Sequence, residues 1–153
     1  MSKGTLTGAV WHIVAIVGAL AGLIVYIVTS TTGYLAGGGI SALLIAMTVV
    51  ALLVLAADIF LKDRLGAVAR DLALLGSLAL IAASFALFIL ARVPLAADVY
   101  FIPVNYPQAE ETALNISLVG LALYLIAVLA LLIESFSARR AATAHGHVAL
   151  AHS

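Results

Sequence analysis

The chain has 153 residues, of which 65% are hydrophobic and only 9% are charged. Soluble domains have about 45–50% apolar and about 25% charged residues, so this composition excludes a soluble globular domain and predicts an integral membrane protein. Seven basic and seven acidic residues give a net charge of zero, which argues against nucleic acid as a partner because nucleic acid needs a basic surface. The absence of cysteine excludes disulfides and thiolate metal sites.

Four apolar runs are long enough to cross a bilayer, for which a helix needs about 20 residues. They cover about residues 8–30, 39–61, 68–91 and 113–136. The first run is longer than the apolar core of a cleaved signal peptide, which is about 7–15 residues, so it predicts an uncleaved helix. The connectors 31–38 and 62–66 are short and make their neighbouring helices antiparallel. The two helical hairpins show no convincing repeat of the kind found in transporters.

The basic residues predict the orientation, because cytoplasmic loops are enriched in Lys and Arg. Arg92 lies on the side opposite Lys3, Lys62, Arg64, Arg70, Arg139 and Arg140. Both termini are therefore expected in the cytoplasm of a cell with the chain in its plasma membrane, and residues 92–112 are expected to form an outer loop. Residues 138–153 lack apolar periodicity and are expected to be a disordered cytoplasmic tail, which leaves residues 1–137 as the transmembrane domain. The Ala- and Leu-rich usage is typical of a GC-rich bacterium.

Each span carries a stripe of small or polar residues, the kind of surface through which membrane helices associate. The stripes are His12, Ala15, Ala19 and Gly22; Ser41, Thr48, Ala51 and Asp58; Arg70, Ser77, Ser84 and Ala91; and Ser117, Gly120, Tyr124, Ala127 and Glu134. Their near-heptad spacing predicts an all-α integral membrane protein: four transmembrane helices in a left-handed antiparallel bundle, N-in/C-in. Gly18 and Gly22 form a GxxxG motif, for which packing within the chain is favoured over homodimerisation.

Four ionisable residues are expected at a similar depth near the cytoplasmic helix ends: His12, Asp58, Arg70 and Glu134. Ionisable groups in a membrane usually face the bundle interior and mark ion or proton sites, so one interpretation is a polar cluster that binds a proton or cation. The other is that these side chains reach the interface and pair with nearby basic residues as topological anchors. The sequence favours the second, because no carboxylate lies at mid-membrane.

The expected outer loop holds all three prolines and two of the five tyrosines. Its candidate docking residues are Arg92, Asp98, Tyr100, Phe101 and Tyr106. Two interpretations stay open, an aromatic belt lying on the lipid headgroups and a docking surface or lid. Arg92 and Asp98 are expected to form an ion pair at the rim. Pro107, Glu110 and Glu111 match the start of the last helix, where negative charge is favoured.

No cofactor, metal site or catalytic motif is expected. A bis-histidine haem site would need a second histidine at the depth of His12, and the others, His145, His147 and His152, lie in the tail. Ser77 and Ser84 have no base at their depth, so an enzyme is not expected. The predicted function is an accessory or interaction subunit of a larger membrane complex, such as a transport complex, and the alternative is a small oligomeric transporter or channel for an ion or small solute. A membrane enzyme or redox anchor comes third. The expected partners are the lipid bilayer and either another membrane protein or a second copy of the chain.

Overall fold

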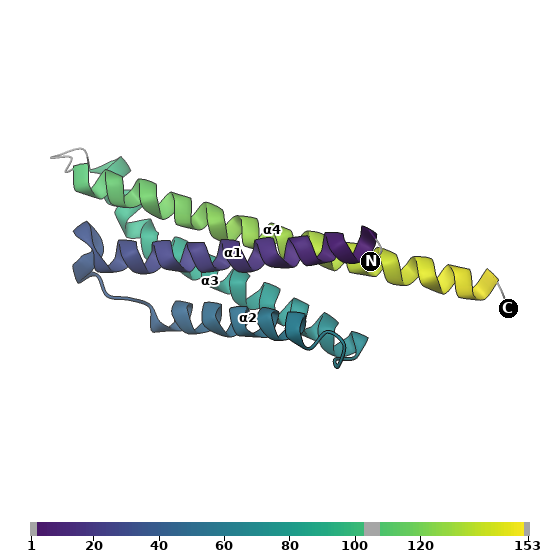
Figure 1. Cartoon of the computed structure of the whole chain (residues 1–153). Helices are drawn as coiled ribbons and strands as arrows, with labels where there is room; N and C mark the ends of the chain where they lie inside the picture. Colours follow the sequence, from purple (N-terminus) through teal and green to yellow (C-terminus); the bar gives the residue numbers. More distant parts are fainter. Residues whose placement is uncertain (1–2, 103–107, 152–153) are drawn as a thin grey trace.

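The computed structural model of the chain is all-helical and describes residues 3–102 and 108–151 (Figure 1). The four long helices are α1 (Lys3–Thr31), α2 (Ala42–Phe60), α3 (Ala67–Phe101) and α4 (Gln108–Ala151). A short 3-10 helix, η1 (Gly33–Gly37), lies between α1 and α2. The expectation of an all-α chain is therefore confirmed.

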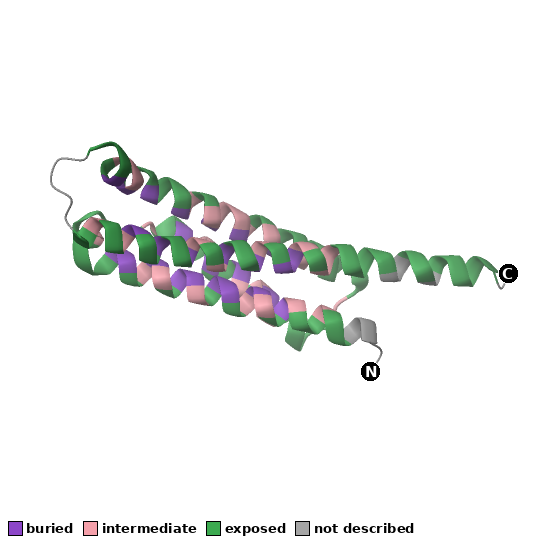
Figure 2. Cartoon of the chain, turned by 90° about the horizontal axis from the view of Figure 1, so that it is seen from above, coloured by how far each residue is buried: buried purple, intermediate pink, exposed green. Residues whose placement is uncertain are grey.

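All four helices contain a segment that is long and apolar enough to cross a membrane. These segments are Leu6–Thr31, Ala42–Phe60, Ala67–Phe101 and Gln108–Arg140, with a mean hydropathy of 2.5 to 2.9. Their outward faces carry many exposed large apolar side chains, while the buried residues form stripes along the inward faces (Figure 2). This distribution is that of a membrane protein, whose apolar outer surface is covered by lipid rather than by water.

The helices run alternately up and down, and α3 passes from the side of α2 at one end to the side of α4 at the other (Figure 1). The chain's two ends and the α2–α3 connection lie at the same end of the bundle (Figure 1). α1 packs along α4, and most of the stripe residues face inward. Those that are buried include His12, Ala15, Ala19, Thr48, Ala51, Asp58, Ser77, Ser84, Ser117, Tyr124 and Ala127. The stripe residues Arg70 and Ala91 are exposed.

Glycines allow α1 and α4 to approach closely. An added Cβ at Gly22 would lie 2.7 Å from the Tyr124 ring, and one at Gly18 would lie 3.0 Å from the Leu123 carbonyl oxygen. From the other side, a Cβ at Gly120 would lie 2.7 Å from Val25 Cγ1. The structure thus places the GxxxG motif against α4 of the same chain.

The connection from α1 to α2 is fixed by hydrogen bonds and by two glycines with positive φ, Gly33 at 68° and Gly39 at 79°. Such left-handed conformations are strained for residues that have a Cβ. The Ser41 N–H donates to the Tyr26 hydroxyl at 2.9 Å. The Ser41 hydroxyl accepts from the Leu44 N–H at 3.3 Å and so caps the start of α2.

The structure differs from the sequence-based expectation around the connection between α3 and α4. The expected outer loop 92–112 is helical up to Phe101, because α3 continues through Pro94. Proline removes one helical hydrogen bond and usually ends a helix. Here Leu95 and Val99, just beyond it, are buried against Leu114 of α4, and this packing holds the last turns in place. Of the expected start of the last helix, Pro107 lies outside the described residues, and Glu110 and Glu111 occupy the first turn of α4.

The expected disordered tail, residues 138–153, is also different, since α4 continues as a helix to Ala151. The sequence offers no apolar stripe there, but it is rich in alanine, which has the highest intrinsic helix propensity. Because the segment continues an already formed helix, it avoids the cost of nucleation, and the high propensity of alanine favours its propagation. Beyond the bundle this part of α4 projects alone (Figure 1).

Three aromatic rings fill the centre of the bundle. Phe88 packs edge-to-face on Tyr26, with ring centroids 5.0 Å apart, and on Tyr124, with centroids 6.0 Å apart. All three side chains are almost completely buried. The Tyr124 hydroxyl forms a hydrogen bond of 2.8 Å with the Thr48 hydroxyl, so the only polar atom of that ring is satisfied by α2. These contacts join all four helices.

Gly120→Ala is expected to destabilise the bundle, because the new Cβ would lie 2.7 Å from Val25 Cγ1 and 2.9 Å from the buried Phe88 ring. Overpacking of this kind costs about 1–3 kcal/mol. Gly76→Ala is the matched control, since it makes the same change inside a helix where a Cβ meets nothing within 4 Å. Thermal unfolding of the purified proteins in detergent should show a lower Tm for Gly120→Ala only. Equal Tm values for the two variants would contradict the packing of α1, α3 and α4 around Gly120.

Candidate functional site

The four ionisable residues singled out from the sequence meet at one end of the bundle, and each comes from a different helix. His12 lies on α1, Asp58 on α2, Arg70 on α3 and Glu134 on α4. Asp58 and Arg70 flank the α2–α3 connection, which lies at the end of the bundle that holds the chain's two ends (Figure 1). We call these four residues the histidine cluster.

His12 makes two hydrogen bonds that together locate a proton. Its Nε2 lies 2.9 Å from the Leu55 carbonyl oxygen, and its Nδ1 lies 2.9 Å from Glu134 Oε1. A carbonyl oxygen can only accept, so Nε2 carries a hydrogen. The contact between Nδ1 and Glu134 then needs a second hydrogen, either on an imidazolium facing a carboxylate or on a carboxylic acid facing a neutral imidazole. In both cases one hydrogen lies between His12 Nδ1 and Glu134 Oε1.

Asp58 and Arg70 form the other half of the cluster. Arg70 Nε donates to Asp58 Oδ1 at 3.1 Å, and Nη2 donates to Oδ2 at 3.4 Å. The two parallel bonds match the fork of a guanidinium to a carboxylate. The Arg70 side chain is 46% exposed, whereas that of Asp58 is 9% exposed. An ion pair that is open on one side adds little stability, and its geometry fits the anchor interpretation as well as the binding one.

One oxygen of the cluster has no partner. Glu134 Oε2 is buried and makes no hydrogen bond within the described part of the chain. Glu134 also lines a cavity of about 270 Å³ together with Asp58, Arg70, Asp71 and Arg139. Buried polar atoms are nearly always satisfied by protein or by water. This oxygen is therefore available to a water molecule, a proton or a small cation.

Arg92 occupies a position that the sequence did not predict. It lies within α3, is only 6% exposed, and points into the bundle rather than pairing with Asp98 at a rim. Its Nε donates to Ser117 Oγ at 3.0 Å, and its Nη2 donates to Thr29 Oγ1 at 2.9 Å and to Ser30 Oγ at 2.8 Å. The guanidinium carbon also lies 5.4 Å from the centroid of the Tyr26 ring and 5.3 Å from that of Phe88.

These partners explain how a cation can be held at this depth. Each hydroxyl accepts a hydrogen bond, and the faces of the two rings attract the positive charge. Thr29 and Ser30 belong to the last turn of α1, where the helix dipole also favours a cation. All of these partners are neutral, so the charge is stabilised without being cancelled.

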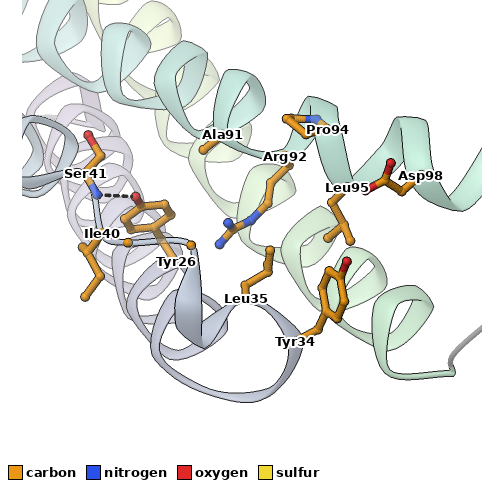
Figure 3. Close-up of a pocket in the computed structure, with 12 residues that line it drawn as sticks. Tyr26, Tyr34, Leu35, Ile40, Ser41, Ala91, Arg92, Pro94, Leu95 and Asp98 are labelled. Atoms are coloured by element: carbon orange, nitrogen blue, oxygen red, sulfur yellow. Dashed lines mark hydrogen bonds between the residues drawn. The ribbon is translucent and has the colours of Figure 1, made fainter.

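Arg92 lines a cavity of about 540 Å³ between η1, the start of α2 and the outer part of α3 (Figure 3). We call it the arginine cavity. Its polar lining residues include Tyr26, Tyr34 and Asp98, and its apolar ones include Leu35, Ile40 and Leu95. In Figure 3 the guanidinium extends into the space between Tyr26 and Leu35. Near the mouth, a hydrogen bond to Glu110 raises the pKa of the Tyr34 phenol.

The remaining candidate docking residues lie at the end of α3. Tyr100 and Phe101 are 71% and 82% exposed, and Asp98 is exposed as well. Tyr106 lies outside the described residues. Of the tail histidines, His147 is exposed on α4, while the side chain of His145 and the whole of His152 lie outside the described part. In the described residues no group of three His, Asp or Glu side chains is arranged to hold a metal ion.

Sequence reasoning missed the partners of Arg92. A signal was present, because Thr29 to Thr32 is a run of four hydroxyl residues at the end of the first span. Ser117 had been placed on the packing stripe of the fourth span. A buried arginine requires several acceptors, and these were the polar residues closest to its depth. Because the third span was expected to end at about residue 91, Arg92 was expected on the outer loop rather than inside the bundle.

Comparisons with known protein families, with curated proteins and with solved structures found no match. The function is therefore inferred from the geometry of the histidine cluster and the arginine cavity.

Glu134→Gln and Glu134→Ala should separate the hydrogen bond of Glu134 from its charge. The glutamine amide can donate to Nδ1 of a neutral His12, so Glu134→Gln is expected to keep a Tm close to that of the original protein. Glu134→Ala leaves a buried imidazole nitrogen unsatisfied, which costs about 1–3 kcal/mol. Asp63→Ala, at an exposed position of the α2–α3 turn, serves as the control for thermal unfolding in detergent. A Glu134→Ala protein as stable as this control would contradict the buried His12–Glu134 pair.

Proposed function

We propose that the chain is an interaction subunit of a larger membrane complex and does not itself provide a route across the bilayer. The observation that supports this is the filled centre of the bundle. On α1, Tyr26 lies between His12 and Thr29; on α3, Phe88 lies between Arg70 and Arg92; on α4, Tyr124 lies between Ser117 and Glu134. The three packed rings thus separate the histidine cluster from the arginine cavity.

On this proposal the bundle is left-handed and antiparallel, lies in the plasma membrane, and has both termini in the cytoplasm. The distribution of charge supports the orientation, because the basic residues Lys62, Arg64, Arg139 and Arg140 lie near the end of the spans where the α2–α3 connection is found. The histidine cluster would then face the cytoplasm and the arginine cavity the outside.

Two exposed surfaces support contact with a partner. The first is the end of α3, where Tyr100, Phe101 and Ile102 are 71%, 82% and 58% exposed. Aromatic residues are enriched at protein interfaces, where a large ring buries much area at little entropic cost. The same residues would also suit the interfacial region of a bilayer, so a direct test of contact is needed.

The second surface is the part of α4 beyond Arg140, which marks the end of its apolar segment. It projects from the bundle (Figure 1), and the apolar side chains of Val148 and Leu150 on it are 58% and 75% exposed. Short helices without tertiary contacts are only marginally stable in water. A partner that packs on this extension would stabilise it.

Photo-crosslinking should detect the partner. A photoreactive phenylalanine analogue placed at Phe101 or at Val148, in the chain expressed at its natural level in its own cells, is expected to give an adduct with one protein of defined mass. The same residue at Leu53, which is 65% exposed in the middle of α2, is the control for random membrane collisions. If both test positions gave only lipid adducts, the subunit proposal would be wrong. Adducts between two copies of the chain would favour the second candidate.

The second candidate is a small oligomeric transporter or channel, and the histidine cluster favours it. His12 and Glu134 share one hydrogen, Glu134 Oε2 has no hydrogen-bond partner in the described residues, and Glu134 lines a cavity. Intramembrane groups of this kind often form proton relays. The conducting route would then run between copies of the chain rather than through one bundle.

Proton flux into liposomes that contain the purified protein and an internal pH dye tests this candidate. If the chain transports protons, the original protein should acidify the lumen, and Glu134→Gln should reduce the rate at least about tenfold, since it keeps the hydrogen bond but removes the exchangeable proton. Asp63→Asn, on the exposed α2–α3 turn, is the control. Equal rates for empty liposomes and for the original protein would exclude proton transport by the chain alone.

A further inference from the structure

We propose that the arginine cavity binds a phosphoethanolamine group, with its phosphate on Arg92 and its ammonium at Asp98. This site is independent of the proposed subunit function and of the histidine cluster. It follows from the unbalanced charges at the two ends of the cavity and from the depth of the site.

At the inner end, Arg92 has a donor group to spare. Nε and Nη2 are used by Ser117, Thr29 and Ser30, whereas Nη1 has no acceptor among the described residues. No carboxylate of the described residues lies within ion-pair distance of Arg92. The ion pairs of the described residues are His12–Glu134 and Arg70–Asp58, and both belong to the histidine cluster. A buried charge is costly unless it is paired, and a guanidinium fits a phosphate through parallel hydrogen bonds. An oxyanion in the cavity would meet both needs.

The hydroxyl partners also position the guanidinium. Three neutral acceptors on α1 and α4 bind Nε and Nη2. The orientation of the guanidinium is therefore fixed, and so is the direction in which Nη1 points. The Tyr26 hydroxyl already accepts from the Ser41 N–H, so its own hydrogen can be donated toward the same space. Tyr26 and Ser41 both line the cavity (Figure 3). The inner end therefore offers donors to an anion.

The outer end has the opposite charge. Asp98 lines the cavity, is exposed, and makes no ion pair in the described structure. Glu110 is close enough to Tyr34, another lining residue, to raise the pKa of its phenol, and it adds a second carboxylate on the same side. A doubly anionic ligand without a cation would be repelled here, whereas an ammonium group would be attracted. The cavity as a whole is complementary to a zwitterion.

An extended zwitterion is long enough to reach both ends of the cavity. Asp98 follows Arg92 by six residues in α3, which separates their Cα atoms by a rise of about 9 Å along the helix. In phosphoethanolamine the charges are separated by about 4–5 Å, and a hydrogen bond of about 3 Å at each end extends its reach to about 10–11 Å.

The depth of the site matches a membrane lipid. Arg92 lies level with Thr29 and Ser30, at the end of the first apolar segment, where a span leaves the hydrocarbon. In a phospholipid with an ethanolamine headgroup the phosphate lies deeper than the amine, in the same order as Arg92 and Asp98. A cavity of about 540 Å³ is larger than this headgroup needs, and Leu35, Ile40 and Leu95 give it apolar walls for the adjoining glycerol and acyl carbons.

Native mass spectrometry of the purified full-length protein tests the proposal. The probes are dihexanoyl phosphatidylethanolamine, dihexanoyl phosphatidylglycerol and free phosphoethanolamine, each titrated separately. The ethanolamine lipid should bind at least about tenfold more tightly than the glycerol lipid, which has the phosphate but no ammonium. If free phosphoethanolamine binds as tightly as the lipid, the site takes the soluble compound; if only the lipid binds, the site is a lipid site. Equal binding of the two lipids, or no binding of any probe, would overturn the proposal.

Two variants connect the binding to the named residues. Asp98→Asn removes an exposed carboxylate without touching the core. It should weaken the binding of the ethanolamine lipid about two- to fivefold and leave the binding of the glycerol lipid unchanged or make it tighter. Asp63→Asn, on an exposed turn at the other end of the bundle, is the matched control and should change neither. Arg92→Lys keeps the positive charge but loses the planar guanidinium, so it should weaken the binding of both lipids. If Asp98→Asn behaved like the control, the ammonium site would be wrong even if Arg92→Lys failed to fold.

Discussion

The buried guanidinium of Arg92 constrains how α1, α3 and α4 can meet. Its hydrogen bonds reach Thr29 and Ser30 on one helix and Ser117 on another, and its face rests against Tyr26 and Phe88. A charge at this depth is tolerated only where acceptors surround it. Rotation of any of the three helices would therefore remove at least one acceptor and leave the charge unsatisfied. Between Arg92 and the histidine cluster, the bundle is filled by packed glycine and aromatic residues.

The structure has two polar regions with different properties. The histidine cluster pairs His12 with Glu134 and Arg70 with Asp58, and a single carboxylate oxygen of the cluster is left without a partner in the described residues. The arginine cavity leaves a cation at its inner end and a carboxylate at its mouth, too far apart to neutralise each other. The packed rings of Tyr26, Phe88 and Tyr124 lie between them. Such an arrangement suits separate binding events at the two ends of the bundle better than passage from one end to the other.

The sequence contains the number of helices and the faces that pack, because both depend on helical periodicity, which is a local property. Most of the stripe residues could be identified from spacing alone, although Arg70 and Ala91 of the third span are exposed. The four members of the histidine cluster could also be identified, since antiparallel helices bring residues of equal depth together. The ends of the helices were harder to predict from the sequence. The continuation of α3 through Pro94 depends on the burial of Leu95 and Val99 against α4, a contact between distant parts of the chain. The partners of Arg92 are separated from it by up to 63 residues and could not be read from any local pattern.

The central claim is that two polar sites open on opposite faces of the membrane and are separated by a closed core. The absence of native cysteine allows a direct measurement, which is labelling of single-cysteine variants in intact and permeabilised cells with a membrane-impermeant maleimide. Asp98→Cys should react in intact cells, Asp63→Cys only after permeabilisation, and Ser84→Cys, at a fully buried position, in neither case. Reaction of Ser84→Cys would reveal a water-filled path through the bundle, and labelling of Asp98→Cys and Asp63→Cys from the same side would contradict the arrangement.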